Sequence, residues 1–283
     1  MRNTNFNDCA RYSTTVAIDY TVMAYILFLS STFGWFLTHY LITHILNTKG
    51  LHLTSNGSDN VKGEISTRRF AIKILSFLHS IFAFIGGIYV IHEVTNGTMT
   101  SLSLQSIASP SLQSIVLFEA GYYGYDFLSD IYRIFLIQHQ CRWLDLSFFV
   151  HHIIPIVVFP AYSLWRQNKW NNNNEQLPFL DYVTALLLVT NINTALTTFR
   201  WMRTVTTGNI PSNLLNQAVV ALYFVCRVGL WPWLLHLYRN QHQQLDVSLF
   251  TVLWSLPYRC SISTTILFLS NLYFWYLNVQ KIL

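Results

Sequence analysis

The sequence predicts an all-α membrane protein with about seven transmembrane helices. Of its 283 residues, 52% are hydrophobic and only 10% are charged, whereas soluble domains usually contain about 25% charged residues. Apolar stretches of roughly 20 residues, long enough to cross a bilayer as a helix, recur along nearly the whole chain. These stretches leave no room for a separate soluble domain of the usual ~100 residues.

The first three predicted spans lie at 20–46, 71–92 and 112–137. The loop after the first span is rich in Asn, Gly, Ser and Thr, which is typical of a solvated connection. Trp35 lies near the end of the first span and is expected to be an interfacial anchor. The third span is apolar except for a small set of charged residues, which indicates a functional stripe.

Four further spans are predicted at 143–165, 179–200, 213–238 and 258–280. Asn171 to Asn174 form a polar connection between the first two of them. Pro257 and Arg259 interrupt the apolar run 249–280, and proline ends or kinks a helix because it lacks a backbone donor. That run is either a broken helix or an interfacial segment followed by a span, so eight crossings are an alternative to seven.

Charge and cysteine content argue against several classes of partner. The net charge of +5 comes from basic residues scattered through short loops, so nucleic acid is not an expected partner. The cysteines form neither a CxxC pair nor a Cys/His metal spacing, and we interpret them as structural: Cys9, Cys141, Cys226 and Cys260. No metal and no cofactor are expected, and a homo-oligomer is left open.

The charged stripe of the third span consists of Glu119, Asp126, Asp130 and Arg133, which are spaced by seven, four and three residues. At ~100° per residue, the four side chains fall within about 60° of one another on a helix. Ionisable side chains inside a membrane are costly and usually functional. We therefore expect this stripe to line a polar cavity between helices.

The His151-His152 pair lies inside the fourth predicted span, about 12–14 Å from its start at 1.5 Å per residue. Adjacent helical residues point about 100° apart, so the two imidazoles cannot clasp one metal ion as an i,i+4 pair would. A buried histidine can take a proton from an attacking amine or hydroxyl, or accept an acyl group itself. An orienting carboxylate is expected from another helix. Alternatively, both histidines are hydrogen-bonded within the bundle.

Two later spans also carry polar faces. Asn191 lies in the fifth span among threonines at heptad spacing, and Asn216, Tyr223 and Arg227 align within about 40° in the sixth. Asn and Thr are most simply interhelical hydrogen-bond partners. Arg227 differs, because a cation this deep in a span needs a carboxylate partner or an anionic head group.

Four segments of the chain form an ordered set of motifs: SFLHSIFAFIGGIYV at 76–90, GYYGYDFLSDI at 121–131, SFFVHHIIPIVVF at 147–159 and NINTALTTFRWM at 191–202. Asn216, Arg227, Pro232 and the closing NLYFWY at 271–276 extend this set. Together they resemble the TLC-domain proteins of endomembranes, which include ceramide synthases, translocating-chain-associating membrane proteins and several lipid-homeostasis proteins. The similarity runs from about residue 70 to residue 280.

The resemblance implies a barrel-like bundle of six helices around a central cavity open toward lipid. It divides the chain into an N-terminal segment, 1–70, with the first span and a polar loop, and a TLC domain, 71–283. The tyrosine-rich third span, the His pair and the arginine of the sixth span would face inward. The expected residues of a lipid or acyl-CoA cavity are then Glu119, Tyr122, Asp130, Arg133, Asn191, Asn216, Tyr223 and Arg227.

The resemblance favours the lipid-homeostasis branch over the synthases. The expected function is that of a multi-pass membrane protein that binds lipid or acyl chains in the cavity and contributes to membrane lipid homeostasis. Membrane lipids are the expected partners. The endoplasmic reticulum is the expected compartment, with another endomembrane or the plasma membrane as alternatives.

The alternative function is that of a ceramide synthase-like N-acyltransferase, which uses acyl-CoA and a sphingoid base and would place the chain in sphingolipid metabolism. His151 or His152 would then be the acyl acceptor or base, with Asp126 or Asp181 orienting the ring or balancing charge. Ceramide synthases carry two aspartates one turn apart in a second motif. Here Asp181 stands alone, with Thr184 in the place of the second aspartate, so the signature is incomplete.

A seven-helix receptor is a third alternative, suggested by the acid-Arg string from Asp130 to Arg133 and by Trp231-Pro232 in the sixth span. A receptor's acid-Arg motif should close the third span, yet acids occur throughout this one. The seventh-span Asn-Pro motif is missing, as is a pair of cysteines bridging the outer loops. These differences disfavour the receptor.

Overall fold

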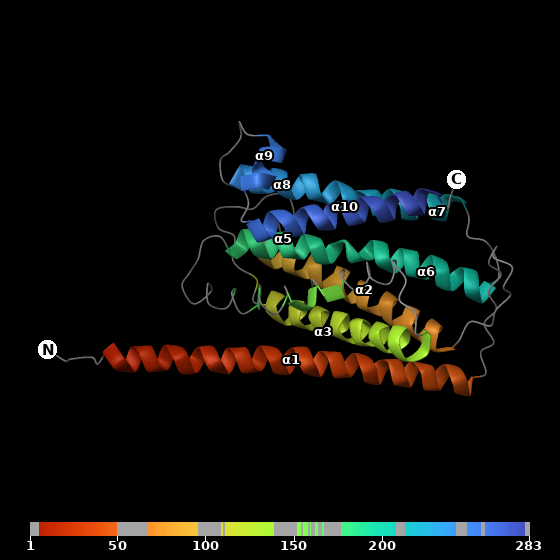
Figure 1. Cartoon of the computed structure of the whole chain (residues 1–283), viewed down its shortest axis with the longest axis horizontal. Coiled ribbons are helices and arrows are strands. Elements are labelled where there is room, and N and C mark those ends of the chain that lie inside the picture. Colours follow the sequence, from red (N-terminus) through yellow and green to blue (C-terminus); the bar gives the residue numbers. More distant parts are fainter. Residues whose placement is uncertain are drawn as a thin grey trace. The chain divides into compact units, whose positions relative to one another are not determined.

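The computed structural model describes residues 6–49, 67–95, 109, 111–138, 152–153, 155–157, 159, 162–163, 166, 177–207, 213–241, 248–255 and 258–280. Every element in these residues is a helix, which confirms the all-α prediction (Figure 1). The elements are α1 (Phe6–Thr48), α2 (Thr67–Val94), α3 (Leu112–Ile131), η1 (Tyr132–Gln138), α5 (Leu177–Val189), α6 (Asn191–Thr207), α7 (Asn213–Tyr223), η2 (Phe224–Gly229), α8 (Leu230–Gln241), α9 (Leu249–Ser255) and α10 (Tyr258–Gln280).

The helices are those of an integral membrane protein. Four stretches of the described chain are long and apolar enough to cross a bilayer: Val22–Thr48, Thr67–Val94, Phe179–Thr207 and Asn213–Asn240. They coincide with four of the predicted spans. The predicted spans 112–137 and 258–280 are also helical, and most of 143–165 lies outside the described residues.

The apolar run 249–280 contains one short and one long helix. The seven residues of α9 extend only about 10 Å at 1.5 Å per residue, too short to cross a bilayer. The 23 residues of α10 extend about 34 Å, which is sufficient. Within 249–280, this pattern favours a short segment followed by one long helix over two crossings.

Three local features differ from the straight helices that hydropathy predicts. The fifth span is divided at Thr190 into α5 and α6, and the Asn193 backbone N–H donates to the Thr190 carbonyl at 3.2 Å. Thr and Asn side chains compete with backbone hydrogen bonds and weaken a helix interior. The η1 and η2 segments are π-helical, a rare geometry that occurs frequently at functional sites.

Internal packing divides the chain into two units. We call residues 1–48 with 82–189 the N-terminal unit, and residues 49–81 with 190–283 the C-terminal unit. The chain passes from one unit to the other at the end of α1, within α2 and between α5 and α6.

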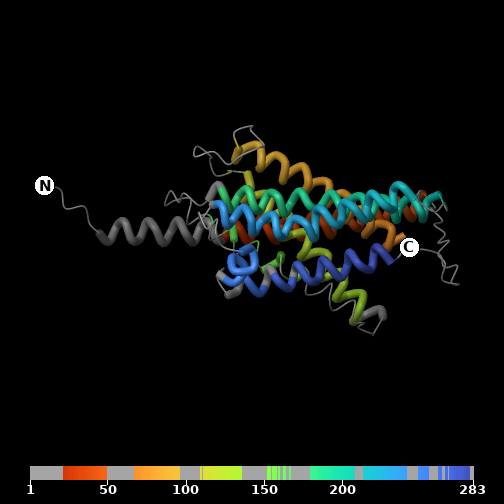
Figure 2. Tube along the Cα trace, turned by 90° about the horizontal axis from the view of Figure 1, so that it is seen from above, coloured from red at the N-terminus to blue at the C-terminus, as the bar shows by residue number. Residues whose placement is uncertain are grey.

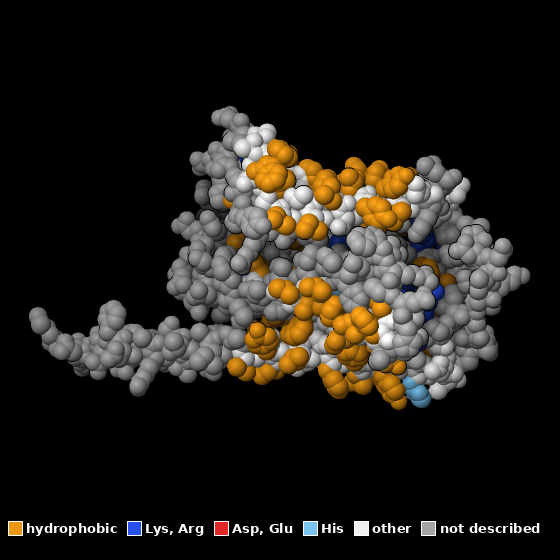
Figure 3. Space-filling model, viewed as in Figure 1, with side chains coloured by type: hydrophobic (Ala, Val, Ile, Leu, Met, Phe, Trp, Pro, Cys, Tyr) orange, Lys and Arg blue, Asp and Glu red, His pale blue; other side chains and the backbone are white. Residues whose placement is uncertain are grey.

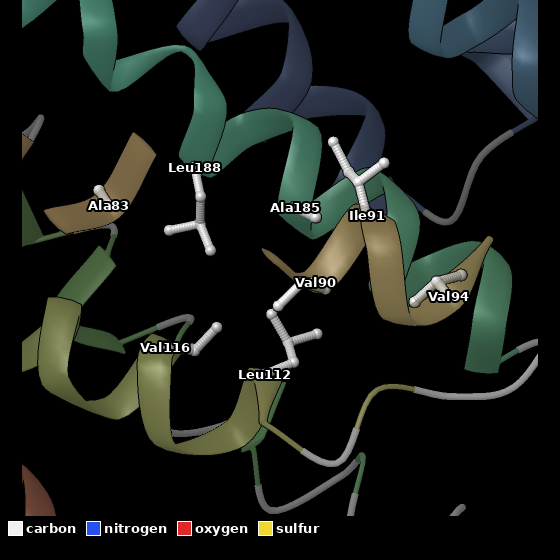
Figure 4. Packing of buried hydrophobic residues seen from close by; sticks show 8 residues of the cluster. All are labelled: Ala83, Val90, Ile91, Val94, Leu112, Val116, Ala185 and Leu188. Atoms are coloured by element: carbon white, nitrogen blue, oxygen red, sulfur yellow. The ribbon is translucent and has the colours of Figure 1, made fainter. Parts of the chain in front are cut away.

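The core of the N-terminal unit lies between α2, α3 and α5 (Figure 4). Its buried members are small or branched: Ala83, Val90, Ile91, Val94, Leu112, Val116, Ala185 and Leu188. Gly87 allows α2 and α5 to approach closely, because a Cβ atom there would lie 2.7 Å from the Ala185 carbonyl oxygen. Small residues at helix crossings stabilise membrane proteins in this way, through close van der Waals contact.

Helix α1 lies along α3 in the same unit (Figure 1). Gly121 allows this close approach, because a Cβ atom there would meet the Ser31 side chain and lie 2.9 Å from the Thr32 backbone nitrogen. The Ser31 hydroxyl donates to the Phe118 carbonyl at 2.9 Å. Trp35 is 7% exposed and its ring packs on Phe118 at 5.2 Å. The expectation that this tryptophan is an interfacial anchor is therefore wrong, because helix packing buries it.

The face of α1 turned away from α3 is apolar and exposed. Hydrophobic side chains gather along it in the space-filling view (Figure 3). Exposure reaches 61% at Met23, 61% at Leu29, 70% at Phe33 and 69% at Tyr40. A continuous apolar face of this length is what a helix in contact with lipid presents.

In the C-terminal unit, α7, η2 and α8 follow one another without interruption and form a single helical run. This run contacts α6 through α7 and contacts α10 through η2 (Figure 2). The first part of α2 packs on α6, where the Phe70 and Trp201 rings lie 6.1 Å apart. The Arg69 guanidinium lies 5.9 Å from the same indole ring, within the range of a cation–π contact.

Candidate functional site

The N-terminal unit brings His152 to the acidic stripe of α3. The imidazole Nε2 lies 3.4 Å from Asp126 Oδ2, and Nδ1 lies 3.8 Å from Asp130 Oδ2. The two aspartates are four residues apart and therefore lie on one helical face. The expectation that a carboxylate from another helix would orient a histidine agrees with these distances.

Arg133 completes this cluster. Its Nε and Nη2 donate to Asp130 Oδ1 at 3.2 and 3.1 Å. Two acids, one guanidinium and one imidazole from the predicted spans 112–137 and 143–165 thus lie together. Their side chains are 11% exposed at His152, 19% at Asp126, 23% at Asp130 and 37% at Arg133. We call these four residues the His152 cluster.

Aromatic rings form one wall of the His152 cluster. The Tyr123 ring lies 5.8 Å from the imidazole and 6.2 Å from Phe159. Tyr122, on the adjacent position of α3, is 4% exposed and meets Trp35 edge-on at 5.3 Å. Tyr122 therefore packs against α1, and Tyr123 is the neighbour of the histidine.

Glu119 lies two helical turns before Asp126 and is fully buried. Its carboxyl group is therefore enclosed within the N-terminal unit. Among the cavity residues predicted on α3, Asp130 and Arg133 belong to the His152 cluster, and Glu119 and Tyr122 are buried closer to the start of the helix.

Asp181 belongs to a second polar cluster, built around a buried ion pair with Arg166. Arg166 donates from Nε to Asp181 Oδ1 at 2.8 Å and from Nη2 to Oδ2 at 2.7 Å. The Tyr162 hydroxyl donates to Oδ1 at 3.0 Å and the Ser109 backbone N–H to Oδ2 at 2.7 Å. Four donors therefore occupy a carboxylate that is 0% exposed.

The Arg166–Asp181 pair also fixes the chain that leads into α3. Arg166 Nη2 donates to the Ser109 carbonyl, and the Ser109 hydroxyl donates to Glu93. Ser111 donates to the same carboxylate at 2.9 Å. This arrangement joins the end of α2, the start of α3 and α5, so its geometry favours an architectural role for Asp181.

Sequence reasoning missed Arg166, which it counted among the basic residues of short loops. The signal was present, because a lone acid at the start of the fifth span requires a basic partner. Between Arg166 and Asp181 the sequence has one other base, Lys169. Spacing along the chain cannot indicate that two such residues meet, because the connection between them sets their positions.

In the C-terminal unit, Arg227 lies in η2 beside the start of α6. Its Nη2 donates to Thr194 Oγ1 at 3.1 Å and to Asn191 Oδ1 at 3.5 Å. Asn191 is 6% exposed. Two of the predicted cavity residues are thus brought together, with Thr194 as an acceptor that sequence reasoning did not assign.

The other two predicted cavity residues of this unit precede Arg227 on the same helical run. Asn216, on α7, accepts a hydrogen bond from Arg200 Nη1 at 3.2 Å. Tyr223 lies one turn before Arg227 and is partly buried. The polar face predicted from Asn216, Tyr223 and Arg227 therefore contacts α6 at two points.

A groove of about 410 Å³ lies on the C-terminal unit between the α7–η2 run and α10. Its lining is almost wholly apolar: Gln217, Val220, Ala221, Phe224, Val225, Trp275 and Val279. The Phe224 and Trp275 rings lie 5.2 Å apart. Within a membrane, such a groove offers van der Waals contact to an acyl chain.

His151, the other member of the histidine pair, lies outside the described residues. In the part of the chain that the structure describes, no group of three His, Cys, Asp or Glu side chains is arranged to hold a metal ion.

A family model matches most of the chain. The model of the TLC domain matches residues 69–280, about three quarters of the chain. Comparisons with curated proteins and with solved structures gave no significant match. The matched range contains the His152 cluster, the Arg166–Asp181 pair and Arg227, and α1 precedes it.

Proposed function

Because the chain belongs to the TLC-domain family, we propose that it binds lipid or acyl chains within the membrane and contributes to membrane lipid homeostasis. The endoplasmic reticulum is the compartment we propose. The observation that carries this function is the His152 cluster: four ionisable side chains held together on and beside α3. Ionisable groups are retained in a membrane span where they meet a polar ligand or pathway.

The groove on the C-terminal unit supports the same function from the apolar side. The acyl chain of a lipid needs apolar contact, and the groove lining is apolar along α7, η2 and α10. Its volume of about 410 Å³ lies within the range of roughly 300–1,000 Å³ typical of small-molecule sites.

Lipid copurification and lipidomics test this function together. The full-length protein, extracted in mild detergent, is expected to retain specific lipids detectable by mass spectrometry. Cells that lack the protein are expected to show an altered lipid composition, restored by the wild-type chain and not by Asp126→Asn. Asn240→Ala, at an exposed position at the end of α8, is the control and should restore it. An unaltered lipidome with no retained lipid contradicts the proposal.

N-acyl transfer is the second candidate, favoured by the 3.4 Å approach of His152 Nε2 to Asp126. A sphingoid amine would attack the thioester carbonyl of acyl-CoA, forming the amide bond and breaking the carbon–sulfur bond. His152 would take the proton from the amine and return it to the departing CoA thiolate. The neighbouring carboxylates would stabilise the imidazolium formed between these steps.

Labelled acyl-CoA and a sphingoid base, incubated with the purified protein, test this second candidate. Turnover that is lost on His152→Ala, and separately on His151→Ala, would support it. Absence of turnover in the wild-type protein would exclude N-acyl transfer between these substrates and leave the lipid-binding function standing.

A further inference from the structure

The helices of the C-terminal unit contain bases but no acids. The first part of α2 and the helices α6, α7, η2, α8, α9 and α10 have no Asp or Glu in their sequences. Their bases are Arg68, Arg69, Lys73, Arg200, Arg203, Arg227, Arg239 and Arg259. Most of these lie near helix ends, where a cation reaches head groups or water.

Arg227 does not lie near an end. It is fourteen residues after Asn213, the start of the span Asn213–Asn240, which corresponds to about 21 Å at 1.5 Å per residue. This places its Cα near the middle of the span. A cation at that depth is costly unless an anion or a network of acceptors compensates its charge.

The described acceptors of Arg227 compensate its positive charge only partly. Thr194 and Asn191 are both neutral, and both bind the same Nη2 atom. A guanidinium has five N–H donors. In the described part of the chain, Nε and Nη1 of Arg227 make no hydrogen bond and the side chain forms no ion pair. The N–H groups of these two nitrogens are therefore available to an oxyanion.

A second cation lies on α6, the helix that carries Thr194. Arg200 is six residues beyond Thr194 on α6, about 9 Å along the axis at 1.5 Å per residue. It also has a neutral acceptor, Asn216. Two arginines thus follow the contact between α6 and the α7–η2 run, and neither has an acid on the helices of its own unit.

We propose that Arg227, with Thr194 beside it, binds the head group of a net-acidic membrane lipid, through a terminal phosphate or a carboxylate. A guanidinium forms charge-assisted hydrogen bonds with both groups. The Thr194 hydroxyl can donate another, because a hydroxyl that accepts from Arg227 keeps its own proton. This site rests on the proposed lipid-binding function and names the class of lipid.

A comparison of lipid affinities by native mass spectrometry tests the site. The purified full-length protein is offered phosphatidic acid, oleic acid and phosphatidylcholine in separate titrations. We expect the wild-type protein to prefer one of the two acidic lipids over phosphatidylcholine by about tenfold to a hundredfold, the range expected for hydrogen bonds to charged groups. The lipid that is preferred distinguishes phosphate from carboxylate.

Matched variants separate this site from nonspecific charge. Arg227→Gln should abolish the preference while phosphatidylcholine binding persists, and Arg227→Lys should keep part of it. Arg239→Gln, which removes one positive charge from the last turn of α8, should leave the preference unchanged. A preference that survives Arg227→Gln, or that Arg239→Gln reduces equally, overturns the proposal.

Two further measurements complete the test. Inorganic phosphate at millimolar concentration should not displace the bound lipid, and displacement would assign the site to a soluble anion instead. Phosphatidic acid or oleic acid should raise the melting temperature of the wild-type protein more than that of Arg227→Gln. If Arg227→Gln instead destabilises the lipid-free and the lipid-bound protein equally, Arg227 is structural and the proposed lipid function stands without this site.

Discussion

The two units of the molecule compensate buried charge in opposite ways. In the N-terminal unit, Arg166 pairs with Asp181 and Arg133 with Asp130, at 2.7 and 3.1 Å. In the C-terminal unit, Arg227 meets only neutral acceptors among the described residues. The difference separates two uses of charge in a membrane. Paired charges join helices to one another, and a charge without an acid on its own helices is available to a ligand.

The largest effect is expected from breaking the buried pair of the N-terminal unit. Arg166→Met leaves Asp181 buried without its cation, and removing one partner of a buried ion pair typically costs about 3–5 kcal/mol. Thermal unfolding of the detergent-solubilised protein measures the loss. The double variant Arg166→Met/Asp181→Leu is the control and should recover much of it, because no uncompensated charge remains. A fully stable Arg166→Met protein would contradict the architectural role.

The next effect is expected where α1 meets α3. Gly121→Ala places a Cβ atom 2.9 Å from the Thr32 backbone nitrogen, and overpacking of this kind costs about 1–3 kcal/mol. Gly34→Ala, on α1, is the control because a Cβ atom there has nothing within 4 Å. Equal melting temperatures for the two variants would mean that α1 does not depend on this contact.

A smaller effect is expected from the polar contact between the same helices. The Tyr125 hydroxyl lies 2.9 Å from His39 Nδ1, and Tyr125→Phe removes that hydrogen bond. Interhelical hydrogen bonds in membranes contribute about 0.6 kcal/mol on average and up to about 1.7. Tyr25→Phe, at a position 54% exposed, should leave the melting temperature unchanged. A larger loss for Tyr25→Phe would reverse the expected order.

The smallest effect on stability is expected in the C-terminal unit. Thr194→Val removes one of the two acceptors of Arg227 at nearly constant volume and should cost about 0.6 kcal/mol, the average for such bonds. It should nevertheless weaken binding of the preferred acidic lipid, because the hydroxyl is one of the proposed donors. If lipid binding is unchanged in Thr194→Val, the guanidinium of Arg227 binds the lipid without the hydroxyl.

Local patterns predicted much of the candidate site. The spacing of Asp126, Asp130 and Arg133 placed them on one face of α3, because helical geometry alone decides this. The expectation that a histidine would meet a carboxylate from another helix agrees with the contact of His152. The ion pair of Asp181 with Arg166 was not predicted, because the two meet through the path of a connection that no periodicity encodes.

The sequence by itself determined the fold class and the described helical spans. A bilayer selects apolar stretches of sufficient length whose backbone groups are satisfied internally, and both properties are local. Only the tertiary structure decided which polar side chains meet and where α1 packs. These outcomes depend on the approach of helices far apart in the chain, because close packing and buried hydrogen bonds form only when both partners are in place.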